Sequence, residues 1–218
     1  PGLDDLRPVS LGQNTRMYDR NGKLLGYIAG VTNRTEIPLS RIPLSLREAT
    51  VAIEDKRFYE HDGVDWVRIV GAAARNTASS DGLRQGGSTI TMQLVKNLYD
   101  PDAPRDFPQK IKEAHLAQEV EARYSKNEIL AKYLNGVFYG QNAVGVQAAA
   151  LTYFDTPVWA ITLPQAALLA GLPQAPSAYN PFWNPKDATT RRNTVLQQMA
   201  EQGYITQAEA AKAKASPL

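Results

Sequence analysis

The chain has 218 residues, of which 43% are hydrophobic, and its formal net charge at neutral pH is only +2. This length and apolar content suffice to bury one good core and exclude a disordered chain. No basic stripe of the kind that binds nucleic acid is present, and the absence of cysteine excludes disulfide bonds and cysteine-ligated zinc.

No apolar run approaches the length of a membrane span, and the chain opens on PGLDDLRPVS rather than on a charged start with an apolar signal core. The lack of cysteine is compatible with an extracytoplasmic protein without requiring one. If the natural protein is exported or anchored, we expect its targeting segment to lie outside this chain.

The first predicted element is a β-hairpin. The segments TRMYD (15–19) and LLGYIA (24–29) flank Asn21-Gly22. Asn-Gly is the dipeptide that best supplies the positive φ angles of a type I′ turn, so the pattern predicts two short strands joined by this turn.

From Pro43 onward the apolar spacing is helical. Ser125 with Glu128, and Thr206 with Glu209, fit the capping box, so helices are expected to begin near residues 126 and 207. The segment LPQAALLAG (163–171) ends in glycine with a proline two residues later, which predicts a helix end. The sequence therefore predicts a mainly α protein.

An acidic side chain occurs on the apolar face of the helix predicted before residue 55. Val51, Glu54 and Phe58 are spaced 0, 3 and 7, which places the Glu54 carboxylate among apolar neighbours. Desolvation of a carboxylate favours general acid or base chemistry. The alternative is an ordinary helix end with its acids in water.

A second acid of this kind is Glu113, which heads an apolar stripe continued by Leu116 and Val120. The alternative is a first-turn acid that suits the helix dipole. Glu119 and Glu121 lie off the stripe, and we expect them on a solvated face.

The segment GGSTITMQLVKNL (86–98) is a glycine-rich turn that leads into a helix. Thr89, Gln93 and Lys96 fall at 0, 4 and 7 and form a polar row beside an apolar stripe. The exposed amides of a helix start and this row favour an anion such as a pyrophosphate. A merely solvated row is the alternative, since no Walker pattern follows the glycines.

Neither of the two histidines, His61 and His115, has a second histidine at a ligand spacing, which argues against zinc. Further along, an apolar stripe at 0, 3, 4 and 7 is expected to form core or, alternatively, to rest on a bilayer. Its members are Trp66, Ile69, Val70 and Ala73.

Five segments in order resemble the consecutive motifs of the peptidoglycan glycosyltransferase family (glycosyltransferase family 51), found in class A penicillin-binding proteins and monofunctional glycosyltransferases. They are EDKRFYEHDG, QGGSTITMQLVKNL, QKIKEAHLAQEVE, SKNEILAKYLN and GVQAAALTYFD. The resemblance runs from about Pro38 to Gly203, and the order of the five motifs makes it specific.

The resemblance implies a lysozyme-like, two-lobed helical domain over residues 38–203. Residues 1–37 are then an N-terminal linker with the β-hairpin, and residues 204–218 a C-terminal helical junction at the start of a linker to an absent domain. It also implies a location at the extracytoplasmic face of the bacterial cytoplasmic membrane, with the anchoring segment absent from this chain.

The implied activity is polymerisation of lipid II into β-1,4-linked glycan strands, with inversion and release of undecaprenyl pyrophosphate. Glu54 would be the general base, and Glu113 the second acid that assists the donor side or holds a divalent cation, Mg²⁺ or Mn²⁺. The implied partners are lipid II, the growing glycan strand, the outer leaflet of the cytoplasmic membrane and moenomycin-type inhibitors, with no nucleic acid.

The resemblance also assigns residues to substrate binding, including contacts to the donor diphosphate. They are Asp55, Phe58, His61, Gly63, Gly87, Ser88, Thr89, Gln93, Lys96, Asn97, Lys110, Lys126, Tyr133 and Asn135. Glu60 and Asp62 are expected to be left to water.

Three positions depart from the family pattern. Gln109 stands where arginine is usual, which removes a bidentate phosphate clamp. Met92 replaces a glutamine at the edge of the polar row, and Ala131 replaces an acid. Either a neighbour such as Arg105 compensates for Gln109, or the enzyme is slower.

Two other functions remain open from the sequence. A lysozyme-like peptidoglycan hydrolase would use one buried glutamate as general acid, but it would not need a diphosphate site. A non-catalytic lipid-diphosphate binding module would agree with glutamine at position 109, whereas the two glutamates weigh against it.

Overall fold

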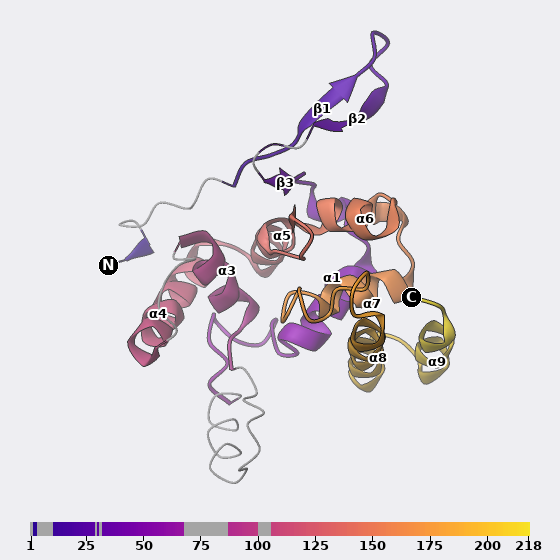
Figure 1. Ribbon diagram of the computed structural model, residues 1–218. Helices are drawn as coiled ribbons and strands as arrows, with labels where there is room; N and C mark the ends of the chain where they lie inside the picture. Colours follow the sequence, from indigo (N-terminus) through magenta and orange to yellow (C-terminus); the bar gives the residue numbers. More distant parts are fainter. Residues whose placement is uncertain (1, 4–10, 29, 31, 68–86, 100–105) are drawn as a thin grey trace. The chain divides into compact units, whose positions relative to one another are not determined.

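The computed structural model describes residues 2–3, 11–28, 30, 32–67, 87–99 and 106–218. The described part of the chain is mainly helical, as predicted (Figure 1). Its helices are α1 (Leu44–Glu54), α3 (Ile90–Tyr99), α4 (Phe107–Arg123), α5 (Lys126–Gly136), α6 (Val146–Phe154), α7 (Leu163–Gly171), α8 (Pro185–Glu201) and α9 (Gln207–Ala215), with 3₁₀ turns η2 (Leu39–Arg41) and η3 (Val158–Ala160). Its strands are β1 (Thr15–Tyr18), β2 (Leu24–Ile28), β3 (Asn33–Arg34) and β4 (Ala143–Val144).

The predicted hairpin is confirmed, because β1 and β2 pair antiparallel. The predicted type I′ turn is wrong: Gly22 has a φ of +80°, but Asn21 is not among the residues with positive φ. The Gly22 amide donates to the Asp19 carbonyl at 3.0 Å, and the Asp19 carboxylate accepts from the Asn21 and Lys23 amides at 2.8 Å each. The acid thus stabilises a three-residue loop that needs one left-handed residue rather than two.

The helix limits predicted from capping residues are confirmed. The Ser125 amide donates to the Glu128 carboxylate at 2.8 Å, and the Thr206 amide donates to Glu209 in the same way. Helix α7 ends at Gly171, as predicted. The N-cap of α4 was missed: the Asp106 carboxylate accepts from the Gln109 amide at 2.8 Å.

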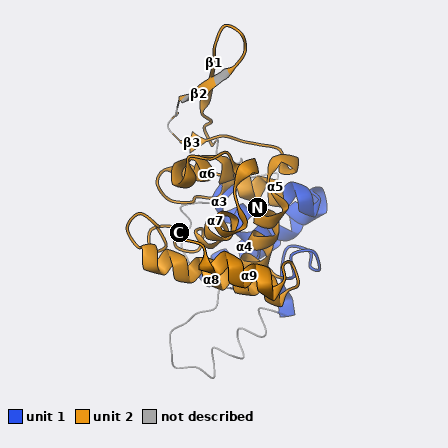
Figure 2. Cartoon of the chain, turned by 90° about the vertical axis from the view of Figure 1, so that its right-hand side faces the viewer, with its two compact units in different colours: residues 1–9, 57–129 blue, residues 10–56, 130–218 orange. Residues whose placement is uncertain are grey.

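The chain divides into two compact units, which agrees with the predicted two-lobed helical arrangement (Figure 2). One unit comprises residues 1–9 and 57–129, and its core lies where α3 packs on α4. The other comprises residues 10–56 and 130–218, where α1 packs on α7 and α8, and α8 on α9. The predicted limits at residues 37 and 203 remain a prediction.

Helix α5 begins in the first of these units and ends in the second. In its second half the Asn135 side chain accepts from the Ile37 amide at 3.0 Å and donates to the Ile37 and Ala131 carbonyls at 2.9 Å each. Asn135 is 2% exposed. A buried amide with these partners stabilises the segment that enters α1, so the structure gives Asn135 a structural role.

None of the helices in the described residues combines the length and the apolar character that a membrane crossing demands.

Candidate active site

Glu54 is the last residue of α1 and is buried, with 9% of the residue exposed. Its burial follows from the apolar spacing, because the face of α1 that carries Glu54 packs against α7 and α8. Asp55, the C-cap residue, is 1% exposed, whereas Glu60 and Asp62 are exposed, as expected. The alternative of a solvated helix end is therefore wrong for Glu54 and Asp55.

Two buried tyrosines belong to the surroundings of Glu54. Burial, with a smaller contribution from the negative charge of Glu54, raises the pKa of the Tyr133 and Tyr139 hydroxyls above the ordinary tyrosine value. Both tyrosines are therefore neutral at physiological pH. Tyr133, which the motifs assign to substrate binding, is fully buried in this unit.

A cation also lies beside Glu54. The Arg191 Nη2 atom is 3.8 Å from Glu54 Oε1, and both side chains are largely buried. Burial lowers the pKa of Arg191, and the Glu54 carboxylate acts in the opposite direction. A carboxylate next to a guanidinium is stabilised in its ionised form, which is the form that a general base requires.

In the other unit, the loop of residues 57–65 contains the rest of the first motif, and an ion pair and a hydrogen bond fix it in place. The Arg57 guanidinium makes a bidentate ion pair with Asp65, which is 1% exposed. The Thr89 hydroxyl donates to the Gly63 carbonyl at 2.6 Å. Gly63 has a φ of +85°, and a Cβ there would lie 2.7 Å from the Ala117 carbonyl carbon. Only glycine fits this position without strain.

Lys126 holds the same loop from α5. Its ammonium donates to the His61 carbonyl, pairs with Glu121 at 2.8 Å and lies 4.6 Å from the centre of the Phe58 ring. Glu121 also accepts from the Thr91 hydroxyl at 2.6 Å. The prediction of a solvated Glu121 is wrong, because its side chain is only 6% exposed and links α3, α4 and α5. Lys126, Phe58 and Gly63 thus support this loop from within the unit.

Glu113 lies on α4 and is 4% exposed. The Lys110 Nζ atom is 2.6 Å from Glu113 Oε2 and 2.7 Å from Ser88 Oγ, so three of the predicted residues come together from two segments. Because α4 begins at Phe107, Glu113 lies beyond the first turn, and the alternative of a first-turn dipole acid is wrong. The Lys110 side chain is 49% exposed, and an ammonium held in this way can bind an anion.

The polar row on α3 is only partly as predicted. Thr89 is fully buried, and its hydroxyl both accepts from the Met92 amide and donates to Gly63, so it caps the helix and fixes the loop. Met92 is 4% exposed and belongs to the core rather than to the edge of the row, which corrects the prediction. Gly87, Ser88, Gln93, Lys96 and Asn97 are partly exposed.

Several predicted features lie outside the described residues. They are Arg105 and the three apolar residues predicted to continue the Trp66 stripe, Ile69, Val70 and Ala73. Trp66 itself is 60% exposed.

A divalent cation would need oxygen ligands, and Glu113 is the predicted one. Within the described ranges, no group of three histidine, aspartate or glutamate side chains is placed to hold a metal. The Lys110 ammonium already neutralises Glu113. Mg²⁺ commonly keeps several waters and takes one or two carboxylates with substrate phosphates, so these residues fit at most a site completed by the substrate.

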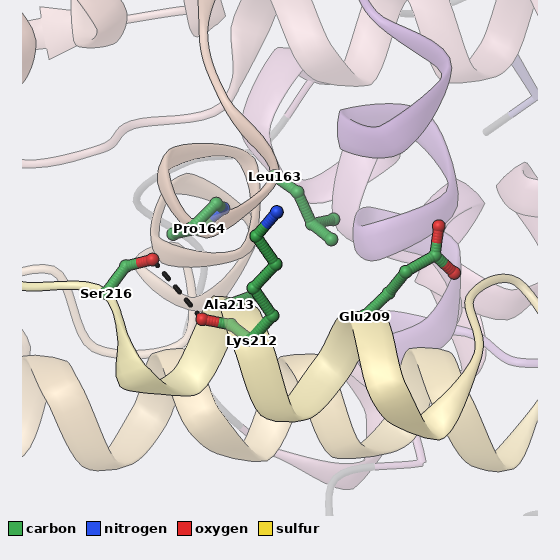
Figure 3. A pocket seen from close by; sticks show the side chains of 6 residues that line it. All are labelled: Leu163, Pro164, Glu209, Lys212, Ala213 and Ser216. Carbon is green, nitrogen blue, oxygen red and sulfur yellow. Dashed lines mark hydrogen bonds between the residues drawn. The ribbon is translucent and has the colours of Figure 1, made fainter.

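One surface cavity lies away from these groups, and a second is lined by a few of them. Figure 3 shows one of about 230 Å³ between the start of α7 and α9, lined among others by Leu163, Glu209 and Lys212. It includes none of the predicted site residues. The other, of about 360 Å³, is lined in part by His61 and Trp66.

Sequence reasoning missed Arg191 and Glu121. Nothing in the local pattern distinguishes Arg191, because its partner Glu54 is 137 residues away and the two meet only when α8 packs on α1. Glu121 lies off the apolar stripe of α4, and its partners come from α3 and α5. In both cases the signal exists only in the tertiary structure.

The family model for transglycosylases matches residues 21–200. Penicillin-binding protein 1A of Aquifex aeolicus is 45% identical over 94% of this chain and 28% of its own length. Penicillin-binding protein 1A of Vibrio cholerae is 41% identical over all of this chain and 26% of its own. The crystal structure of penicillin-binding protein 1A from Haemophilus influenzae is similar with a TM-score of 0.55 and 27% identity, over 97% of this chain and 21% of that one.

The chain thus spans about a quarter of the length of these relatives. The family match covers most of the chain and contains all five motifs on which the resemblance was based. The chain belongs to the transglycosylase family, the peptidoglycan glycosyltransferases of glycosyltransferase family 51.

Proposed function

We propose that the chain polymerises lipid II into β-1,4-linked glycan strands, with inversion at the anomeric carbon and release of undecaprenyl pyrophosphate. The observation that carries the proposal is that both glutamates singled out by the motifs are buried beside a cation. Glu54 lies beside Arg191 and Glu113 beside Lys110. A buried ionised carboxylate suits proton abstraction, and an exposed ammonium suits a diphosphate.

In this reaction Glu54 takes the proton from the 4-hydroxyl of the acceptor lipid II. The hydroxyl oxygen then bonds to C1 of the terminal sugar on the growing chain. The bond between C1 and the diphosphate oxygen breaks, and its electron pair leaves with undecaprenyl pyrophosphate. Attack opposite the leaving group gives the inverted β-linkage.

On the donor side, negative charge builds up on the departing diphosphate. Lys110 and Ser88 offer an ammonium and a hydroxyl at one place, and Glu113 keeps the ammonium oriented from its buried position. Charge stabilisation of this kind is often the largest single contribution to catalysis. A polymer hydrolase would have no diphosphate to stabilise, so this group favours transfer.

A divalent cation, Mg²⁺ or Mn²⁺, is part of the proposal at Glu113. When bound, it would supply further positive charge to the diphosphate, with water and phosphate oxygens as its other ligands. The chain's own residues do the remaining work: Glu54 accepts the proton, and Lys110 neutralises the leaving group.

The proposed place of action is the outer leaflet of the bacterial cytoplasmic membrane, where the chain would bind lipid II, the growing strand and moenomycin-type inhibitors. Trp66 and Val67, 60% and 67% exposed, are candidates for the lipid contact.

The test is incubation of the chain with lipid II and divalent cation, in comparison with Glu54→Gln. Glycan formed by the wild type and lost by about 10²-fold or more in the variant would support the proposal, since a general base contributes at least this factor. Glu60→Gln is the matched control, because Glu60 belongs to the same motif but is exposed. Breakdown of preformed glycan, or binding of lipid II without turnover, would contradict the proposal.

A further inference from the structure

Two other residues of the same unit contact Arg191 and fix its position. Its Nε atom donates to the Gly171 carbonyl at 3.1 Å, and its guanidinium lies 5.5 Å from the centre of the Tyr179 ring. A Cβ at position 171 would lie only 2.8 Å from Arg191 Cγ. Glycine at the end of α7 therefore makes room for the arginine as well as ending the helix.

In this position an Arg191 amino group lies near Glu54, with Nη2 3.8 Å from Oε1. Because one N–H is held by a backbone carbonyl and the stem is packed against α7, the guanidinium has little freedom to turn away from the carboxylate. Arg191 is 13% exposed and Glu54 10%, measured on their side chains. Solvent therefore screens this pair less than a surface ion pair.

Several nearby groups do not supply a positive charge to Glu54. Tyr133 and Tyr139 are neutral, and Asp55, next in the chain, is an acid. Helix α7, which packs on α1, has no titratable side chain in its sequence LPQAALLAG. On α8, the neighbouring Arg192 instead donates to the carbonyls at positions 214, 216 and 217.

We infer that Arg191 is a positioning residue for the reaction: held by Gly171, its guanidinium keeps the Glu54 carboxylate ionised, so that the base works at lower pH than it would without this guanidinium. This inference rests on the proposed function of Glu54 as general base. Arg191 itself does not take the proton, since a guanidinium stays charged in proteins. Its effect passes through the carboxylate.

The first experiment measures the pH dependence of glycan formation by the 218-residue chain and by Arg191→Met. Without the guanidinium, protonation of Glu54 becomes easier, so the acidic limb of the profile should move to higher pH by about 1–3 units. Relative to the wild type, Arg191→Met should lose less activity at pH values above the limb than at pH values below it. Arg191→Lys keeps a positive charge, so its acidic limb should lie close to that of the wild type.

Gly171→Ala tests the contact between Gly171 and the Arg191 side chain without removing a charge. Its methyl group would displace the arginine stem, so the acidic limb should move in the same direction as in Arg191→Met, by a smaller amount. Arg192→Met is the matched control, since it removes a buried arginine from the next position of α8 that bonds elsewhere. Its limb should stay where the wild type has it, even if its stability falls.

The second experiment follows the Glu54 carboxyl by ¹³C NMR titration, with Glu54→Gln used to assign the signal. This measurement needs no substrate, so it separates the two proposals. A wild type that makes no glycan would defeat the proposed function, while a titration midpoint raised in Arg191→Met would still support the coupling. An unchanged midpoint and an unchanged limb in folded Arg191→Met would overturn the inference while glycan formation stands.

Discussion

Lys110 and Glu113 lie on the same face of α4, with the ammonium nitrogen 2.6 Å from the buried carboxylate. The acid is 5% exposed on its side chain and the lysine 49%, so the pair joins the interior of its unit to the surface. The buried carboxylate therefore holds the half-exposed ammonium in a fixed position. Its proposed role on the diphosphate leads to the first prediction.

Lys110→Met should lower kcat/KM for lipid II by about 10²–10³-fold, because it removes a preorganised charge from the leaving group. The measurement is the rate of glycan formation at several lipid II concentrations. Lys186→Met removes the same charge from an exposed position of α8 and should leave the rate unchanged. Equal rates for both variants would show that Lys110 does not act on the diphosphate.

Gln109→Arg should lower KM for lipid II by about tenfold, since a charge-assisted hydrogen bond contributes on the order of 1.5 kcal/mol. The substitution leaves the Asp106 cap intact, because that cap uses the backbone amide of residue 109. Ala122→Arg adds the same charge at an exposed position of α4 as a control. No change, or a loss of affinity, would mean that another cation already fills the role.

Gly63→Ala should destabilise the protein more than Gly22→Ala does. Both glycines have positive φ, which costs an alanine about 1–2 kcal/mol. Only at position 63 would the methyl group meet backbone, with the Ala117 carbonyl atoms 2.7 Å away, whereas nothing lies within 4 Å at position 22. Urea unfolding measures both free energies. A loss at position 63 no larger than at position 22 would contradict the close packing of the loop on α4.

Trp66→Ser should weaken binding to vesicles of anionic phospholipid by about tenfold or more, because burial of a large aromatic side chain contributes roughly 2–3 kcal/mol. Sedimentation with the vesicles measures the effect, and circular dichroism checks the fold. Trp183→Ser is the matched control, since Trp183 is also exposed, at 68%, but belongs to the other unit. Unchanged binding of Trp66→Ser would argue against a lipid contact at this residue.

The helical fold and its limits were largely readable from the sequence, because capping boxes, helix-ending glycine and apolar spacing act within a few residues. The spacing also indicated the burial of Glu54 and Glu113, since each shares a helical face with apolar side chains, but it left a solvated helix end and a first-turn acid open until the structure showed both side chains buried. The hairpin was predicted at the right place, but its turn type was not. The Asp19 carboxylate bonds two loop amides, and this interaction outweighed the preference of the Asn-Gly pair.

Local spacing could not show which polar groups are used inside the protein. The Thr89 hydroxyl, read as part of an anion row, is bonded to Gly63, and Glu121, read as solvated, is bonded to Thr91 and Lys126. These partners lie on other segments. Whether a side chain is available to bind a ligand depends on such contacts between segments, and these contacts leave no periodic pattern in the sequence.

The sequence by itself determined the helix limits and the family motifs, and it indicated the two buried acids, because these depend on residues close together in the chain. Only the tertiary structure decided which charge Glu54 meets. Lys110 is one turn from Glu113 and Arg191 is 137 residues from Glu54. The stretch AIEDKRFYEHDG contains the proposed base, but the packing of α8 on α1 supplies the cation that keeps it ionised.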